Sequence, residues 1–146
     1  PLDALNNWNR IYGRSGFTQY QFVLPLESSR QGLMEILARI AQSGQGSFLA
    51  VLKLFGRENE NYLSFPRQGY TLALDFKITR SLFPLLDELD AIVADHGGRL
   101  YLTKDVRMKP EMLRSGYPRL NHFLGIRQKN GASKMFRSKQ SIRLGI

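Results

Sequence analysis

A single lysine stands where a strand is expected to give way to a loop. Lys104 ends the run that begins at Arg99, in which apolar and polar residues alternate as in a short strand. Loops that follow rigid elements often carry chemistry, and an ammonium group there can stabilise negative charge that develops in a reaction. Further groups that could bind a hydroxyl-rich ligand lie at predicted strand positions: Gln19, Gln21, Lys53, Asp75 and Tyr101.

Several other kinds of site are excluded. The chain has no cysteine, which rules out disulfides, thiolate zinc sites and cysteine nucleophiles and favours a reducing, cytoplasmic compartment. His96 and His122 are far apart in the sequence, and no metal site is expected. No Gly-x-Gly-x-x-Gly, P-loop or Gly-x-Ser-x-Gly motif is present. The acidic cluster of the second predicted helix is assigned to solvent, with Arg80 and Arg99 as surface partners; it comprises Asp87, Glu88 and Asp90.

Strands and helices are predicted in the order strand, helix, strand, strand, helix, strand. Alternating or apolar runs predict strands over residues 17–24, 48–55, 70–78 and 99–104. Amphipathic helices are expected after the capping serines Ser28 and Ser81 and end at glycines. This order predicts an α+β fold of the ferredoxin-like type, βαββαβ, in which both helices cover one face of an antiparallel sheet.

The length of 146 residues fits a single domain. We expect a lead-in over residues 1–16, the βαββαβ core over 17–104 and a basic helical region over 105–146, with short helices from Pro110, over 118–129 and after Ser133. No apolar run approaches the ~20 residues that span a bilayer. The chain begins at Pro1, so we expect it to be a piece of a longer polypeptide.

Strand periodicity places the polar candidates on one face of the sheet. If the helices cover the face with Tyr20, Phe22 and Leu74, the opposite face is polar. The register of the other two strands decides whether Lys53 and Tyr101 join it. An antiparallel sheet can also turn such a face to water. The polar face carries Gln19, Gln21, Thr71, Ala73 and Asp75.

The positive charge of the chain is concentrated at its C-terminus. The net charge is +9, and residues 104–146 hold 11 Lys and Arg against only Asp105 and Glu111. Such a region could meet nucleic acid, an anionic membrane or a phosphate-bearing ligand, or simply keep the protein soluble. An RNA-recognition module would place aromatic residues on its central strands, where this chain has Gln19, Gln21, Thr71 and Ala73, so nucleic acid is not expected. A nucleic-acid-binding or anion-binding module remains the alternative function, and a catalytically silent regulatory domain is a third.

Seven runs of the sequence resemble the C-terminal half of the decaprenylphosphoryl-ribose oxidase family, a branch of the vanillyl-alcohol-oxidase-type flavoproteins that is related to sugar-lactone oxidases. The combination of the runs QYQF, LKLFG and GGRLYLTKD is fairly specific, and the runs keep their order and spacing. They are WNRIYG from Trp8, QYQFVLP from Gln19, FLAVLKLFG from Phe48, LSFP from Leu63, LDF from Leu74, GGRLYLTKD from Gly97 and YPR from Tyr117.

The resemblance implies a two-domain enzyme. An N-terminal domain outside this chain would hold most of the FAD, and this substrate-binding domain would lay its sheet over the flavin. Lys104 matches the active-site lysine of the family, which lies near flavin and substrate. Tyr101, Gln19 and Gln21 match pocket residues, and so do Lys53 and Phe55.

The implied reaction is the oxidation of a sugar hydroxyl on a polyprenylphosphoryl pentose, or on a related sugar or lactone such as D-arabinono-1,4-lactone. An ammonium group beside the flavin would stabilise charge that develops during hydride transfer. Thr71 and Ala73 stand where mycobacterial members of the family carry an asparagine and a cysteine, so the pocket is expected to differ in shape and polarity. The basic C-terminal region would suit a phosphate-linked lipid at a membrane surface. Alone, the chain is expected to be inactive.

Overall fold

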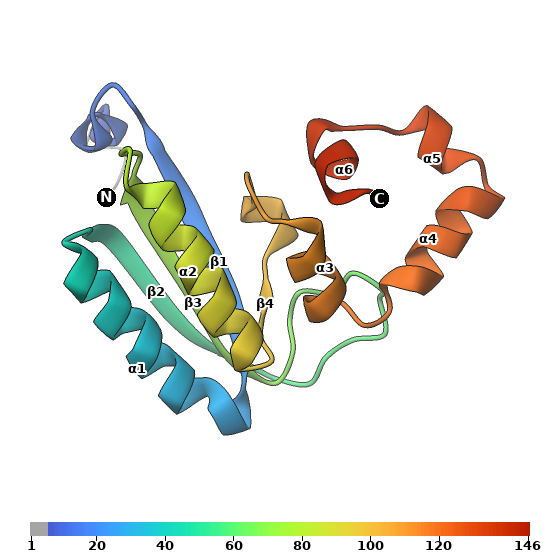
Figure 1. Ribbon diagram of the computed structural model, residues 1–146, viewed down its shortest axis with the longest axis horizontal. Coiled ribbons are helices and arrows are strands. Elements are labelled where there is room, and N and C mark those ends of the chain that lie inside the picture. Colours follow the sequence, from blue (N-terminus) through green and yellow to red (C-terminus); the bar gives the residue numbers. More distant parts are fainter. Residues whose placement is uncertain (1–5) are drawn as a thin grey trace.

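The computed structural model describes residues 6–146, so the first five residues of the predicted lead-in lie outside the described part. A four-stranded antiparallel sheet carries two long helices on one face (Figure 1). A 3-10 helix, η2 (Trp8–Tyr12), precedes the sheet. The predicted α+β, ferredoxin-like arrangement is confirmed. The strands are β1 (Phe17–Pro25), β2 (Ser47–Phe55), β3 (Gly69–Lys77) and β4 (Arg99–Leu100), in the spatial order β2-β3-β1-β4, and the helices are α1 (Leu26–Ser43) and α2 (Leu82–Asp95).

The pairing of β1 with β3 decides which side chains the helices cover. The two strands pair without interruption from Phe17 opposite Lys77 to Pro25 opposite Gly69. Successive side chains of a strand point to opposite faces, so the even-numbered residues of both strands point toward the helices. Six of them are buried there with the apolar stripe of α2 and form part of the hydrophobic core: Tyr20, Phe22, Leu24, Leu72, Leu74 and Phe76. Members of this core include Phe22, Leu24, Ile36, Phe76, Leu82, Leu86 and Leu89.

Neither predicted capping serine caps its helix with its side chain, because both hydroxyls bind other groups. α1 begins at Leu26, directly after β1, so Ser28 lies in its first turn and not at its cap. The Ser28 hydroxyl donates to the His96 carbonyl at 2.8 Å, which ties α1 to the end of α2. Ser81 does precede α2, but its hydroxyl caps no backbone N–H and accepts a hydrogen bond from Gln45 at 2.7 Å. Both helices are confirmed. The predicted cap at Ser28 is wrong, whereas Ser81 occupies the predicted N-cap position of α2 without a side-chain bond to its backbone.

The fourth strand is much shorter than the predicted 99–104. β4 has two residues and pairs with two residues of β1. The Tyr101 N–H still donates to the Gln21 carbonyl at 2.9 Å, and the chain then turns into a 3-10 helix, η3 (Leu102–Lys104). Alternation of apolar and polar residues could not distinguish a longer strand from a strand followed by a 3-10 helix, because a 3-10 turn of three residues has no periodic signal of its own.

Four short helices make up the C-terminal region. α3 packs against β4 and α2, and α6 packs on α3, whereas α4 and α5 extend away from the sheet (Figure 1). The basic helix predicted after Ser133 is two helices: the first ends at Met135, and Ser138 forms a capping box with Ser141 at the start of the second. No helix of residues 6–146 is long and apolar enough to cross a membrane. The helices are α3 (Pro110–Gly116), α4 (Leu120–Lys129), α5 (Ala132–Met135) and α6 (Lys139–Leu144).

One acid of α2 is buried, contrary to the prediction that the whole cluster is solvated. Asp90 accepts hydrogen bonds from the Tyr20 hydroxyl at 2.9 Å and from Arg107 at 2.8 Å. Burial raises the pKa of Asp90, and the Arg107 guanidinium opposes that shift. Asp87 and Glu88 are exposed as expected. The sequence could not show the difference, since both partners of Asp90 come from distant segments.

Gly69 occupies a backbone position that a side chain would strain. Its φ is +150°, and a Cβ there would lie 1.9 Å from the Leu24 carbonyl oxygen. We expect Gly69→Ala to lower the free energy of unfolding by about 3 kcal/mol or more, because the backbone of β1 would have to move. Gly125→Ala on α4 is the matched control, since nothing lies within 4 Å of the added methyl group. Urea denaturation measures the stability of both variants, and equal stability would contradict the strain expected at Gly69.

Candidate functional site

The face of the sheet that α1 and α2 leave uncovered, here termed the open face, carries most of the predicted site residues. Gln19 of β1 lies opposite Asp75 of β3, and Gln21 lies opposite Ala73. β2 adds Lys53 in the next row of the same face. Three strands that are separated in sequence therefore contribute to one surface, and the register of the sheet alone brings their polar side chains together.

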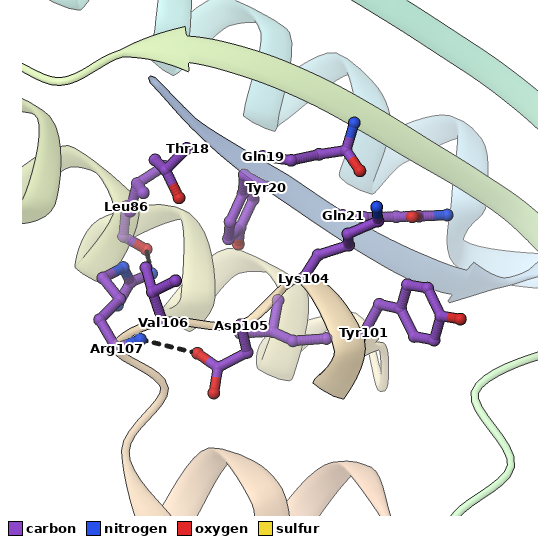
Figure 2. Close-up of a pocket in the computed structure, with 11 residues that line it drawn as sticks. Thr18, Gln19, Tyr20, Gln21, Leu86, Tyr101, Lys104, Asp105, Val106 and Arg107 are labelled. Carbon is purple, nitrogen blue, oxygen red and sulfur yellow. Dashed lines mark hydrogen bonds between the residues drawn. The ribbon is translucent and has the colours of Figure 1, made fainter. Parts of the chain in front are cut away.

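A small hollow opens beside β1 at the point where β4 stops. Because β4 pairs with only two residues, the part of β1 from Thr18 to Gln21 has no strand neighbour on that side. Gln19, Gln21, Tyr101 and Lys104 are among the residues that line the hollow (Figure 2). Its volume is about 20 Å³, which is room for about one water molecule. A sugar would therefore lie over its mouth and not inside it.

Lys104 reaches across this hollow. Figure 2 shows its side chain extending from η3 toward β1, beside Gln21. The side chain is exposed, and no acid of residues 6–146 forms an ion pair with it. An ammonium group without an acidic partner is available to a bound anion or to charge that develops in a reaction.

Asp105 holds the turn that presents Lys104. Its carboxylate accepts hydrogen bonds from the backbone N–H groups of Arg107, at 2.8 Å, and Met108, at 2.5 Å. The Arg107 side chain then bonds to Asp90 of α2, so the turn is also tied to the helical layer. The direction of the lysine is thus determined by the residues that follow it in the chain.

Helix α6 fastens the same turn from the C-terminal end. Arg143 pairs with Asp105 at 2.8 Å, and Gln140 donates to the Leu102 carbonyl at 2.6 Å. Burial acts to raise the pKa of Asp105, but the hydrogen bonds from Arg143, from two backbone N–H groups and from Gln140 outweigh burial and lower the pKa. The charged carboxylate is therefore favoured in the folded state.

An aromatic side chain that the sequence did not single out covers one end of the open face. Phe65, in the loop between β2 and β3, is 4% exposed and stacks on Tyr101 with ring centroids 4.4 Å apart. The Phe55 ring meets Phe65 edge-on at 5.9 Å. Three aromatic rings thus form a row across the sheet. The available signal was a Phe–Pro pair at the end of a polar loop, which indicates a turn and no particular contact.

Arg99 anchors this loop, and it is buried instead of pairing with the α2 acids at the surface as predicted. Its guanidinium donates to the Ser64 carbonyl at 2.7 Å and pairs with Glu58 at 2.9 Å. It also lies over the Tyr117 ring, 5.3 Å from the centroid. Arg119 bonds to the same carboxylate at 3.3 Å. The loop is thereby tied to β4 and to the segment before α4.

The other end of the open face is covered by the segment that precedes β1. Tyr12 is buried, stacks on Phe17 at 4.2 Å and meets Phe48 edge-on at 5.1 Å. Its hydroxyl donates to Asp75 at 3.3 Å, and Gln19 donates to the second carboxylate oxygen at 2.7 Å. Asp75 is 3% exposed. It therefore belongs to the packing of this end and does not face a ligand.

The remaining predicted residues lie in three different environments. Thr71 is buried, donates to the Phe22 carbonyl at 2.7 Å and accepts a hydrogen bond from Gln21 at 3.2 Å. Ala73 is half-buried opposite Gln21, and Lys53 is exposed on the edge strand. Thr71 can therefore orient an amide but cannot itself contact a ligand, whereas Ala73 and Lys53 border the uncovered centre of the open face.

A larger hollow, of about 540 Å³, lies on the other side of Tyr101. The loop between β2 and β3, η3 and α4 line this open hollow, and its volume is in the range of small-ligand sites. Because Tyr101 borders both hollows, a ligand that contacts Lys104 has room to extend past the ring. The aromatic residues that line the larger hollow are Tyr62, Phe65, Tyr101, Tyr117 and Phe123.

Comparison with known proteins shows which sequences the chain resembles. Over all 146 residues, the chain is 42% identical to decaprenylphosphoryl-β-D-ribose oxidase of Mycolicibacterium smegmatis. The chain resembles this oxidase along its whole length. The aligned part is 32% of the relative, which fits a C-terminal domain of such an oxidase, as the sequence runs implied.

A second relative gives a similar picture. An uncharacterized protein from the mprA 5′ region of Streptomyces coelicolor is 38% identical over 115 residues, which are 78% of this chain and 31% of the relative. The chain thus spans about a third of the length of both relatives. No protein-family model matches it.

Asp105→Asn tests the network that holds Lys104. The pKa of Asp105 is lowered in the folded state, so its stabilising effect is present above the ordinary aspartate pKa of about 3.9 and is lost as the pH falls toward the folded value. We expect the variant to be about 1–2 kcal/mol less stable at neutral pH and to lose less stability on acidification. Urea denaturation across this pH range measures both effects.

Asp95→Asn is the matched control for this prediction, because Asp95 is exposed at the end of α2. It should reproduce the wild-type dependence of stability on pH. If Asp105→Asn also showed the wild-type dependence of stability on pH, the Asp105 network would contribute nothing to the stability of the turn.

Proposed function

We propose that this chain is the substrate-binding domain of an FAD-dependent oxidoreductase that oxidises a sugar hydroxyl by hydride transfer. The observation that carries the proposal is the ammonium group of Lys104, which pairs with no acid of residues 6–146 and which a hydrogen-bonded turn holds over a face with two amides. The similarity to a decaprenylphosphoryl-β-D-ribose oxidase supports this class of chemistry. The substrate that we infer is a polyprenylphosphoryl pentose or a related sugar or aldonolactone.

The two glutamines of the open face are oriented to accept hydrogen bonds from sugar hydroxyls. Nε2 of Gln19 donates to Asp75, and Nε2 of Gln21 donates to Thr71. Thr71 gives its own proton to a backbone carbonyl, so its oxygen can only accept from Gln21. Neither amide oxygen has a donor within the described part of the chain. Both oxygens remain available to hydroxyl groups, so this surface would select a ligand that donates hydrogen bonds.

The open face suits one side of a flavin ring but not the whole of FAD. Its centre is sheet that no helix covers, and Tyr101 and Lys104 both line the hollow at one edge. When bound, FAD supplies the acceptor for the hydride that leaves the carbinol carbon. Lys104 would hold a fixed positive charge beside ring and substrate and stabilise negative charge that develops there. Since the sequence contains no phosphate-binding loop, we infer that an N-terminal domain of the same polypeptide binds the FAD phosphates.

The proposed chemistry needs a cover over the open face. An ammonium group in contact with water stabilises charge weakly, because solvent screens it, and the hollow beneath Lys104 is too small to enclose a sugar. We infer that the flavin-binding domain closes over the centre of the face and excludes water, while Tyr12 and Phe65 already cover its two ends. Without that domain the chain should not oxidise the substrate.

A hybrid enzyme tests this function. The matching third of the M. smegmatis oxidase is replaced by this chain, and flavin reduction by decaprenylphosphoryl ribose is followed by absorbance under anaerobic conditions. We expect the hybrid to retain flavin and to be reduced by substrate. Lys104→Ala should slow reduction by about 10²-fold or more, because a fixed positive charge is lost beside the reacting centre. Lys104→Arg, which keeps the charge, should recover part of that loss.

Lys109→Ala is the matched control. This exposed lysine pairs with Asp87 at 3.5 Å on the surface of the helical layer and does not line the hollow. It should leave flavin reduction unchanged. A folded, flavin-loaded hybrid that substrate does not reduce would count against the proposed function, and equal rates in Lys104→Ala and Lys109→Ala would remove Lys104 from it.

A further inference from the structure

The two most exposed large apolar side chains of residues 10–146 are neighbours at the end of α5. Met135 is 75% exposed and Phe136 is 68% exposed. Both precede the cap of α6, and neither belongs to the open face. Two large apolar side chains that are mostly exposed and adjacent form an apolar patch, which is a candidate interaction site.

Cations flank this apolar pair in the sequence, and acids are absent from the same segment. No aspartate or glutamate follows Glu111. The nearby lysines and arginine are exposed, and none of them forms an ion pair with an acid in the described part of the chain. They are free to meet an anionic partner. The cations are Lys129, Lys134, Arg137 and Lys139.

The backbone presents the pair in a fixed turn. Arg127 of α4 donates to the Phe136 carbonyl at 2.8 Å and to the Ala132 carbonyl at 3.4 Å, which closes the segment between α4 and α6. Ser138 caps α6 immediately afterwards. Figure 1 shows α4 and α5 reaching away from the sheet, so the segment lies at a distance from the two-layer core. Its apolar tip is therefore accessible without disturbing the fold.

We propose that residues 129–139, here termed the basic tip, bind an anionic membrane surface. Met135 and Phe136 would insert at the boundary between headgroups and acyl chains, and the four cations would contact lipid phosphates. The combination favours a lipid surface over nucleic acid or an acidic peptide, because those partners would meet the cations but leave the apolar pair in water. This inference does not depend on the proposed oxidase activity, although it would bring such an enzyme to a lipid-linked substrate.

Vesicle flotation with the 146-residue chain tests the basic tip. The probes are vesicles of phosphatidylcholine alone and vesicles with about one-third phosphatidylglycerol, at low and physiological salt. We expect binding to the anionic vesicles and little to the neutral ones. Met135→Ser with Phe136→Ser should weaken binding by about 10-fold or more, and Lys134→Gln with Arg137→Gln should weaken it by about fivefold per charge.

Matched substitutions on another helix distinguish binding by the basic tip from non-specific binding of exposed apolar side chains to vesicles. Met34 and Leu37 on α1 are 63% and 51% exposed, so Met34→Ser with Leu37→Ser removes comparable apolar surface from a segment without clustered cations. This control should leave vesicle binding unchanged. Equal losses in the two double variants, or no binding of the wild type to anionic vesicles, would overturn the proposal. Circular dichroism confirms that each variant is folded.

A tryptophan at the tip reports insertion directly. Trp8 is the one tryptophan of the sequence, so Phe136→Trp in a Trp8→Phe background gives a single probe. Its emission should shift to the blue when anionic vesicles are added. The same substitution in the hybrid oxidase distinguishes a lipid site from a contact with the rest of the polypeptide. Emission that is already blue-shifted there, with no response to vesicles, would overturn the membrane proposal while leaving flavin reduction to judge the proposed function.

Discussion

The pairing of β4 with β1 over only two residues is the constraint on which the site depends. If the strand continued, residues 101–104 would complete the sheet and their side chains would alternate across it. Instead the Tyr101 N–H makes the last bond to β1, and the chain turns into η3. The turn leaves part of β1 without a neighbour, opens a hollow there and directs Lys104 across it (Figure 2). An early end of the fourth strand thus presents the lysine on which the proposed chemistry depends.

Charged groups stabilise the turn from two independent layers. Asp105 receives hydrogen bonds from the backbone that follows it and from Arg143 of α6. Arg107 joins the same segment to Asp90, which is bonded to Tyr20 in the core. Each of these acids is buried to a degree that would be costly without a partner, so the network holds only when helices, sheet and C-terminal segment are all in place. The position of Lys104 therefore depends on contacts from the helical layer, the sheet and the C-terminal segment.

The open face carries two amides on β1, the apolar Leu49 and Val51 on β2, and aromatic rings at both ends. Phe65 and its neighbours close one end, and Tyr12 with its partners closes the other. Buried Asp75 and Thr71 accept from the amide nitrogens of the two glutamines, so each amide is oriented by a buried partner. A surface organised in this way differs from the ordinary solvated face of an antiparallel sheet, because its polar groups are ordered by buried partners and are not left to water.

How much the sequence could predict follows from the range of each interaction. Periods of two and of 3.6 residues are local patterns, so the sequence could predict the strands, both long helices and their order. The same periodicity predicted that Gln19 and Gln21 lie on the opposite face of the sheet from Tyr20. The serine side-chain caps failed because competing partners, His96 and Gln45, lie far away in sequence. Phe65, Asp90 and Arg99 were missed or assigned to solvent for the same reason. The sequence by itself determined which face of each element is apolar. Only the tertiary structure decided where β4 ends, which acids are buried and where Lys104 points, since those outcomes depend on contacts between segments that no local pattern records.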